Sequence, residues 1–311
     1  MKSINEIKEM AKDVIKKIKF LFKETANEFI EDNAIKLSAS LSYYTVFSLP
    51  PLLIIIISLC GFFYGAEAVS GELYGQIKGL VGADAAIQIQ EVVKNVKLSK
   101  DNTFATIIGV ITLLIGASGV FSEMQDSINY IWGIQAKPKR GLIKFVKNRL
   151  MSFSMIGSLG FILMVGLIVN SLMDVMYSRL TNFITIDTFY LFYASNLFVV
   201  FIIITLLFLI IFKILPDGKI ALFDCLVGAA FTAFLFMIGK FAIGAYLGNS
   251  NVVTAYGAAG SVILIMVWVY YSAFILYFGA EFTKVFTRTH GKNIHPNEYT
   301  IKVLKPQEEV N

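Results

Sequence analysis

The sequence predicts an all-α polytopic membrane protein, in which six transmembrane helices form a bundle and both chain ends lie in the cytoplasm. Hydrophobic residues make up 56% of the 311 residues, more than the roughly 45–50% of soluble domains, and the mean hydropathy is +0.69. Six apolar stretches are each long enough to cross a hydrocarbon core about 30 Å thick. Lys and Arg are concentrated in alternate segments between these stretches. We therefore expect a multi-pass protein of the cell membrane.

Residues 1–36 predict an amphipathic helix on the cytoplasmic side. Apolar residues recur at helical spacing from Ile4 to Phe29, and residues 1–37 contain eight Lys and seven acids. A helix of this kind lies on a membrane surface or on the bundle itself. We interpret its lysines as a solvated face, and recognition of anionic lipids is the alternative.

The first predicted span, residues 37–63, contains the consecutive prolines Pro50 and Pro51. Proline lacks a backbone N–H and disfavours the helical conformation of the residue before it, so the pair leaves two carbonyls without partners. In a bilayer such a break persists only where other helices, hydroxyl groups or water satisfy those carbonyls. Ser42 and Thr45 lie on one helical face beside the prolines. We therefore expect a broken first helix packed inside the bundle.

The other predicted spans follow in order along the chain. They cover residues 103–122, 150–173, 189–212, 220–247 and 255–282. Between the first two spans, residues 64–102 carry apolar positions at helical spacing, which predicts amphipathic helices on the outer face. Residues 37–283 together form the six-helix domain, and residues 284–311 form a polar cytoplasmic tail that we expect to be partly disordered.

The distribution of Lys and Arg sets the predicted orientation. Segments 1–37, 133–149, 213–219 and 283–311 contain 21 of the 27 Lys and Arg residues, and the alternate segments contain 5. Because cytoplasmic loops carry this excess, both termini are predicted to be cytoplasmic. The same loops account for the net charge of +5, so the charge does not indicate a nucleic-acid partner.

Ionisable residues near the membrane are the first candidates for function, because charge is costly there. Glu123, Asp126 and Asn129 follow the second span and share one helical face. Asp224 near the start of the fifth span and Glu281 near the end of the sixth are expected at the same cytoplasmic level. Two interpretations stay open. These carboxylates pair at the interface with Lys36, Lys213 or the basic loop at 133–149, or they line the mouth of a cavity open to the cytoplasm.

Lys240 lies inside the fifth predicted span, near its outer end. Its side chain can reach the interface by snorkelling, and the alternative is a cation in a groove that meets a lipid head group. No cluster of His, Cys and carboxylates has metal-ligand spacing, so we predict no metal, no cofactor and no catalytic residue. The candidate substrate-binding residues are Ser42, Thr45, Pro50, Pro51, Glu123, Asp126, Asn129, Asp224, Lys240 and Glu281.

Four segments resemble the YihY/BrkB family of bacterial inner-membrane proteins, once labelled ribonuclease BN. They are ASLSYYTVFSLPPLL at 39–53, FSEMQDSINYIWG at 121–133, the stretch from LPDGK to GAYL at 215–247, and the stretch from AAGSV to GAEFT at 258–283. The Pro50 and Pro51 pair stands where one proline is common, and Phe236 where tryptophan is frequent. The resemblance implies six membrane helices with cytoplasmic termini in the bacterial inner membrane, and links to serum resistance and envelope lipid handling.

Among function classes, we favour the handling or translocation of lipids or other envelope amphiphiles, with membrane lipids as partners. A secondary transporter of a small solute is the alternative; such proteins usually carry mid-membrane carboxylates or discontinuous helices, and only the proline pair fits that description. An enzyme, the ribonuclease included, is disfavoured because the two histidines, His290 and His295, both follow the last span. A structural scaffold of the envelope stays open.

Overall fold

The computed structural model describes residues 4–64, 103–136, 186–248, 258–298 and 300–303, together with the isolated positions 71, 74–75, 87, 90, 150, 154 and 157–158. Six long helices account for most of these residues. They are α1 (Ile4–Glu31), α2 (Ala34–Tyr64), α5 (Thr103–Ile131), α7 (Ile186–Ile214), α8 (Leu222–Gly248) and α10 (Ala258–Thr289). The described part of the chain is therefore mainly helical, as the sequence predicts.

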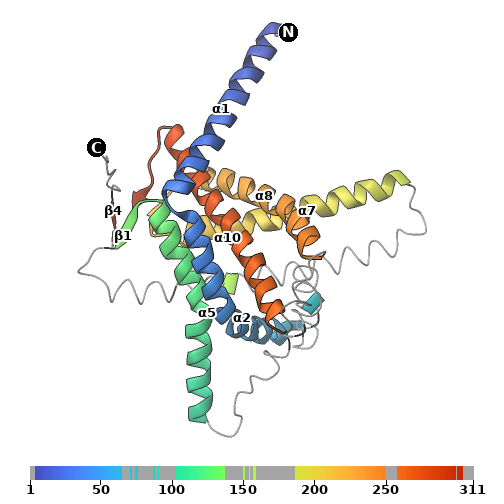
Figure 1. The fold of residues 1–311 in the computed structure, drawn as a ribbon, viewed down its shortest axis with the longest axis vertical. Helices are drawn as coiled ribbons and strands as arrows, with labels where there is room; N and C mark the ends of the chain where they lie inside the picture. Colours follow the sequence, from blue (N-terminus) through green and yellow to red (C-terminus); the bar gives the residue numbers. More distant parts are fainter. Residues whose placement is uncertain are drawn as a thin grey trace.

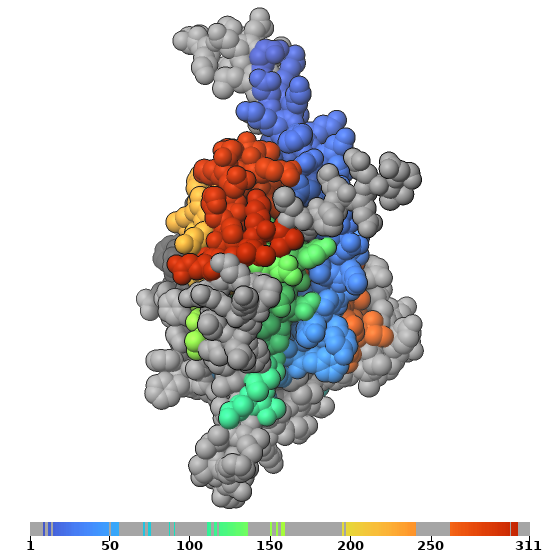
Figure 2. Space-filling model, turned by 90° about the vertical axis from the view of Figure 1, so that its left-hand side faces the viewer, coloured from blue at the N-terminus to red at the C-terminus, as the bar shows by residue number. Residues whose placement is uncertain are grey.

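Helix α10 lies at the centre of this arrangement (Figure 1). It packs against α2 and α8, and α1 packs against it as well. Helix α2 also packs along α5, and α7 along α8, so the described helices form two pairs that are joined through α10. In Figure 2 the red C-terminal region lies against the blue base of α1 and the green end of α5, while the rest of α1 extends beyond the body.

Three of the described helices are long and apolar enough to cross a membrane. Their candidate spans are Leu197–Ile214, Leu222–Lys240 and Val262–Thr289, which match the predicted fourth, fifth and sixth spans. The predicted first and second spans form α2 and α5. Apart from isolated positions, the structure does not describe the third predicted span or residues 65–102, and it does not describe the end of the tail. The count of six spans and the orientation therefore remain predictions.

Helix α2 is continuous through Pro50 and Pro51, so the predicted break in the first helix is wrong. The fixed φ of proline fits a helix, and the remaining obstacles are the lost hydrogen bonds and the bulk of the ring. Helix α5 leaves room for that bulk, because a Cβ at Gly116 would lie 3.0 Å from Pro51 Cγ. A Cβ at Gly119 would lie 3.0 Å from Ser48 Oγ. Close approach of α5 thus supports the continuous helix at the prolines.

Short strands fold the C-terminal segment back onto the helices, which the sequence did not predict. Strand β1 (Ile134–Ala136) pairs antiparallel with β4 (Thr300–Lys302), and β2 (Gly218–Lys219) pairs antiparallel with β3 (His295–Pro296). The tail is therefore ordered in its described residues up to 303, and the expectation that it is partly disordered remains a prediction for the rest. The physical reason is that the backbone groups just after α5 and α7 find partners in the tail.

Helices α8 and α10 approach so closely that glycine on one helix accommodates threonine on the other. A Cβ at Gly228 would lie 1.9 Å from Thr283 Oγ1, and a Cβ at Gly279 would lie 1.9 Å from Thr232 Oγ1. Each threonine hydroxyl donates a 2.7 Å hydrogen bond to the carbonyl of the glycine four residues earlier on its own helix. Small residues of this kind allow close packing of membrane helices, and here they fix α8 against α10.

Candidate functional site

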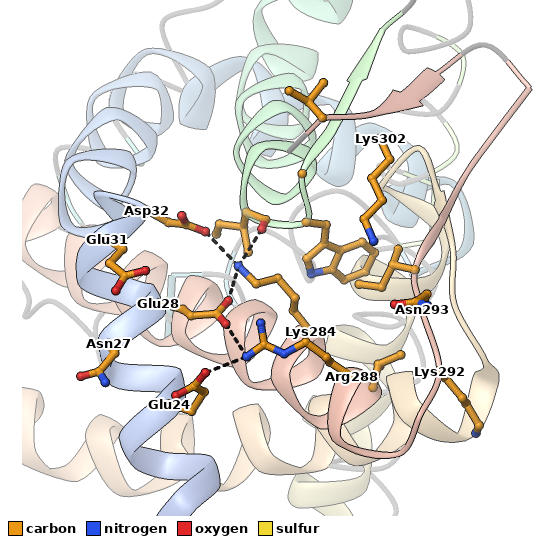
Figure 3. Close-up of a pocket in the computed structure, with 16 residues that line it drawn as sticks. Glu24, Asn27, Glu28, Glu31, Asp32, Lys284, Arg288, Lys292, Asn293 and Lys302 are labelled. Atoms are coloured by element: carbon orange, nitrogen blue, oxygen red, sulfur yellow. Dashed lines mark hydrogen bonds and ion pairs between the residues drawn. The ribbon is translucent and has the colours of Figure 1, made fainter. Parts of the chain in front are cut away.

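A pocket of about 590 Å³ opens where α1, α5 and α10 meet the C-terminal segment. We call it the charged pocket, because its lining includes Glu24, Glu28, Glu31, Asp32, Lys284, Arg288, Lys292 and Lys302. The four acids all belong to α1 or the turn that follows it. In Figure 3 these acids lie on one side, and Lys302 and Asn293 lie on the other.

Lys284 forms the centre of an ion-pair cluster between α1 and α10. Its Nζ lies 2.6 Å from Glu28 Oε2, 3.0 Å from Asp32 Oδ2 and 2.8 Å from Glu281 Oε2. It also donates a 3.0 Å hydrogen bond to the carbonyl of Ile131 at the end of α5. The Glu281 side chain is fully buried and that of Lys284 is 19% exposed. One ammonium therefore joins three segments that are far apart in the sequence.

Arg288 extends the same cluster toward the surface. Its Nη2 lies 2.8 Å from Glu24 Oε1 and 2.7 Å from Glu28 Oε1. With Lys284 included, two cations face the four carboxylates of Glu24, Glu28, Asp32 and Glu281. The cluster thus carries more negative than positive charge when all its groups are ionised.

Aromatic contacts hold α1 in the position that makes this cluster. The ring of Phe29 lies 4.6 Å from that of Phe274 and 5.6 Å from that of Phe278, measured between centroids. Phe22 contacts Phe231 of α8 at 5.3 Å. These phenylalanines project from the bundle-facing side of α1, next to the face that carries the acids. Apolar packing therefore directs the carboxylates of α1 toward α10.

A second, smaller pocket of about 420 Å³ lies beside the first. Asp224 at the start of α8 lines it, and its Oδ1 lies 3.2 Å from the Nζ of Lys292. The Asp224 side chain is 1% exposed, whereas that of Lys292 is 50% exposed. Both pockets share Thr287, Lys292 and Asn293 as lining residues. The segment after α10 therefore separates two polar pockets at one end of the bundle.

Asn129 and Asp217 form a buried junction between α5 and the turn before β2. Asn129 Nδ2 donates to Asp217 Oδ2 at 3.0 Å, and the backbone N–H of Asp217 donates to Asn129 Oδ1 at 2.8 Å. The carbonyl of Asp217 accepts bonds from the N–H of Asn297 at 2.9 Å and from Thr300 Oγ1 at 3.2 Å. Nearby, Trp132 Nε1 donates a 3.1 Å hydrogen bond to the carbonyl of Ala280 and so connects the end of α5 to α10.

The sequence-predicted carboxylates do not share one pocket among the described residues. Glu281 lies in the Lys284 cluster, and Asp224 lines the second pocket. Glu123 is half-buried and Asp126 is exposed, and neither lines either pocket. Asn129 belongs to the buried junction. Glu281 and Asp224 do pair with lysines, but these are Lys284 and Lys292 rather than the partners expected from the sequence.

The predicted residues within the spans lie apart from both pockets. Ser42 donates a 2.8 Å bond to the carbonyl of Met266 on α10, and Thr45 donates to the carbonyl of Leu41 on its own helix. Pro51 packs against Gly116, and the side chain of Pro50 lies outside the described residues. Lys240 is exposed near the end of the described part of α8. Ser42 and Pro51 thus contact neighbouring helices, and none of the described side chains among these residues lines either pocket.

Sequence reasoning missed the acids of α1 and their cationic partners on α10. The signal was present, because Glu24, Glu28 and Asp32 recur every four residues and form an acidic stripe along one face. On α10, Lys284 and Arg288 have the same spacing of four residues. Two stripes of opposite charge, one at the end of the first helix and one at the end of the last, predict a contact between those helices. No comparable signal marks Asp217.

The arrangement can bind a polar or charged group. Among the described residues, no group of three His, Cys, Asp or Glu side chains is placed to hold a metal ion. Cys225 is a free thiol buried inside α8. The charged groups of the pocket are held in ion pairs on the side of α1, and Lys302 lies opposite them.

Comparison with known proteins identifies the family. The family model described as Virulence factor BrkB matches residues 25–300. The chain belongs to this family. The match includes Glu28, Glu31 and Asp32 of the charged pocket but ends before Lys302, and the resemblance stated from the sequence is confirmed.

Curated relatives are membrane proteins of similar length. A UPF0761 membrane protein of Pseudoalteromonas atlantica is 29% identical, covering 79% of this chain and 78% of its own. One of Aeromonas salmonicida is 25% identical over 83% of this chain and 85% of its own. A longer one, from Saccharophagus degradans, is 23% identical over 91% of this chain, which spans 63% of the relative's length. No solved structure matches the chain.

Proposed function

We propose that this BrkB-family membrane protein handles or translocates lipids or other envelope amphiphiles in the bacterial inner membrane. The observation that supports the proposal is the position of the charged pocket at the end of an apolar helix. The candidate span of α10 runs to Thr289 and so includes Lys284 and Arg288, which line that pocket. Charged groups at the end of a span lie at the depth of lipid head groups.

Exposed apolar side chains on α1 and α2 support this proposal. Ile30 is 67% exposed, and Ile35 near the start of α2 is 49% exposed. An amphiphile would gain from contact of its chains with such surface. A small hydrophilic solute would gain nothing from that surface. We propose membrane lipids as partners, with neither enzymatic chemistry nor a nucleic-acid partner.

Reconstitution in liposomes tests the proposal. Labelled phospholipids and a labelled glycolipid are added to one leaflet, and their movement to the other is followed by quenching of the label. We expect faster movement of at least one lipid class than in protein-free liposomes and in liposomes with an unrelated membrane protein. Equal rates for every head group would contradict lipid translocation.

Secondary transport of a small solute is the second candidate, and one observation favours it. The amide of Gln125 on α5 is fully buried, and neither its Oε1 nor its Nε2 has a hydrogen-bond partner among the described residues. Buried amides without partners are rare and call for water or a ligand. Solute-dependent proton or sodium uptake that is lost in Gln125→Leu, while the variant keeps its thermal stability, would favour transport over lipid handling.

A further inference from the structure

We propose that the charged pocket binds a zwitterionic head group that carries a primary amine and a phosphate, as phosphoethanolamine does. This inference rests on the proposed function and names the ligand chemistry of the same pocket. It follows from the opposite charges of the two pocket walls and from their position at the end of a span.

The wall formed by α1 has an excess of negative charge. Four carboxylates line this wall, those of Glu24, Glu28, Glu31 and Asp32, and two cations of α10, Lys284 and Arg288, lie among them. Glu31 lines the same wall, is exposed, and forms no ion pair within the described part of the chain. An ammonium group, with three N–H donors and no acceptor, fits this wall. A phosphate would meet electrostatic repulsion there.

The opposite wall is positive. Lys302 lines the pocket from β4, where its backbone is held in register opposite Ile134 of β1. In Figure 3 Lys302 extends toward Asn293, across the pocket from Glu31. Lys292 contributes less to this wall because its ammonium is bound by Asp224 in the second pocket. Lys302 and the Asn293 amide can therefore donate to a phosphate.

Size and depth agree with a head group. A volume of about 590 Å³ is within the range of small-molecule sites, and Lys284 and Arg288 occupy the last two turns of the α10 span. A ligand with only a phosphate would leave the acidic wall uncompensated, and a ligand with only an amine would leave Lys302 uncompensated. A zwitterion compensates both walls.

Calorimetry on the purified full-length protein in detergent tests the inference with soluble probes. The probes are glycerophosphoethanolamine, which carries both charges, glycerophosphoglycerol, which carries only the phosphate, and ethanolamine, which carries only the amine. We expect glycerophosphoethanolamine to bind at least tenfold more tightly than either single-charge probe. Similar affinity for all three probes, or no binding, would overturn the inference.

Variants of the two exposed wall residues connect the binding to this pocket. Glu31→Gln and Lys302→Gln should each weaken binding of glycerophosphoethanolamine by about tenfold, as expected for the loss of one charge-assisted hydrogen bond. The matched controls are Glu9→Gln, an exposed acid of α1 outside the pocket, and Lys16→Gln, an exposed lysine of α1 outside it. Equal affinity of the wall variants and the controls would overturn the assignment to this pocket.

Nanodiscs with and without phosphatidylethanolamine identify the source of the head group. If the probe fails to bind only in discs that contain this lipid, the lipid competes for the pocket, and the head group comes from the membrane. If probe binding is the same in both kinds of disc, the ligand is a soluble amine phosphate. Both results support the head-group chemistry. Lipid movement in liposomes is measured on the same preparations. Lipid movement without selective binding overturns this inference alone, and selective binding without lipid movement overturns the proposed function alone.

Discussion

Helix α10 contacts two of its neighbours, α8 and α1, through different kinds of interaction. Against α8 the contact is dry, with Gly228 and Gly279 accommodating Thr283 and Thr232 at distances that leave no room for a methyl group. Against α1 the contact is charged, with Lys284 and Arg288 placed among carboxylates. The first depends on shape and the second on ion pairs that are partly open to water. We conclude that the stability of the α8–α10 contact depends on packing, whereas the stability of the α1–α10 contact depends on charge and on salt concentration.

The largest expected effect comes from removing the cation at the centre of the charged contact. Lys284→Met leaves the buried Glu281 without its cation, and breaking a buried pair costs about 3–5 kcal/mol of unfolding free energy. Denaturant unfolding in detergent measures the loss. The double variant Lys284→Met and Glu281→Met should recover only part of it, because Glu28 and Asp32 also lose their cation. Lys240→Met, which changes an exposed lysine outside the cluster, serves as control. A single variant as stable as the control would show that the cluster does not hold α1.

The buried junction outside both contacts should be next in size. Asn129→Ala removes two hydrogen bonds to Asp217 and leaves that carboxylate and its N–H less satisfied, at a cost of about 2–3 kcal/mol. Asn129→Asp should be no better than alanine, because it places a second carboxylate beside the first. The same unfolding assay reports both. Wild-type stability of Asn129→Ala would mean that the strands alone hold this end.

The dry contact is tested by adding one methyl group. Gly279→Ala places a Cβ 1.9 Å from Thr232 Oγ1 and should cost about 1–3 kcal/mol through overpacking. The unfolding free energy lost in Gly279→Ala should be the same in low and high salt, whereas the loss from variants of the charged contact should depend on salt. Gly157→Ala is the matched control, since a Cβ there meets nothing within 4 Å. Salt dependence of the Gly279 effect would contradict the contrast between the two sides.

The smallest expected effect lies at the exposed edge of the charged contact. Arg288→Gln removes ion pairs to Glu24 and Glu28, but the Arg288 side chain is 52% exposed, so the loss should be at most about 1 kcal/mol. High salt should reduce the difference from wild type, because surface charges are screened. Unfolding measured at two ionic strengths checks this. If Arg288→Gln lost as much unfolding free energy as Lys284→Met, solvent exposure of the cation would not explain the difference expected between the two variants.

Hydrophobic runs predicted the long helices because twenty apolar residues leave few alternatives in a bilayer. The sequence could not show that α2 continues through Pro50 and Pro51, because the room for the Pro51 ring comes from Gly116, sixty-five residues later. Local rules for proline predict a break, and the packing of another helix outweighs them. The strands of the tail were missed for a related reason, since two or three residues carry no periodicity.

The candidate site was only partly predictable. Charge at the membrane interface drew attention to Glu281 and Asp224, and in the structure these pair with Lys284 and Lys292. The pocket itself depends on the crossing of α1 over α10, and that crossing is set by Phe22 and Phe29. The residues missed on α1 belonged to a helix whose charges looked like an ordinary solvated face. Matching its acidic stripe to the basic one on α10 requires comparison of segments more than 250 residues apart.

The junction at Asp217 has a consequence for biosynthesis. The backbone and side chain of this one residue accept bonds from position 129 and from positions 297 and 300. Positions 297 and 300 follow α8 and α10 in the chain, so Asp217 meets these partners only after both helices have been synthesised. The end of the bundle that carries the charged pocket is therefore completed later than the helices that it joins.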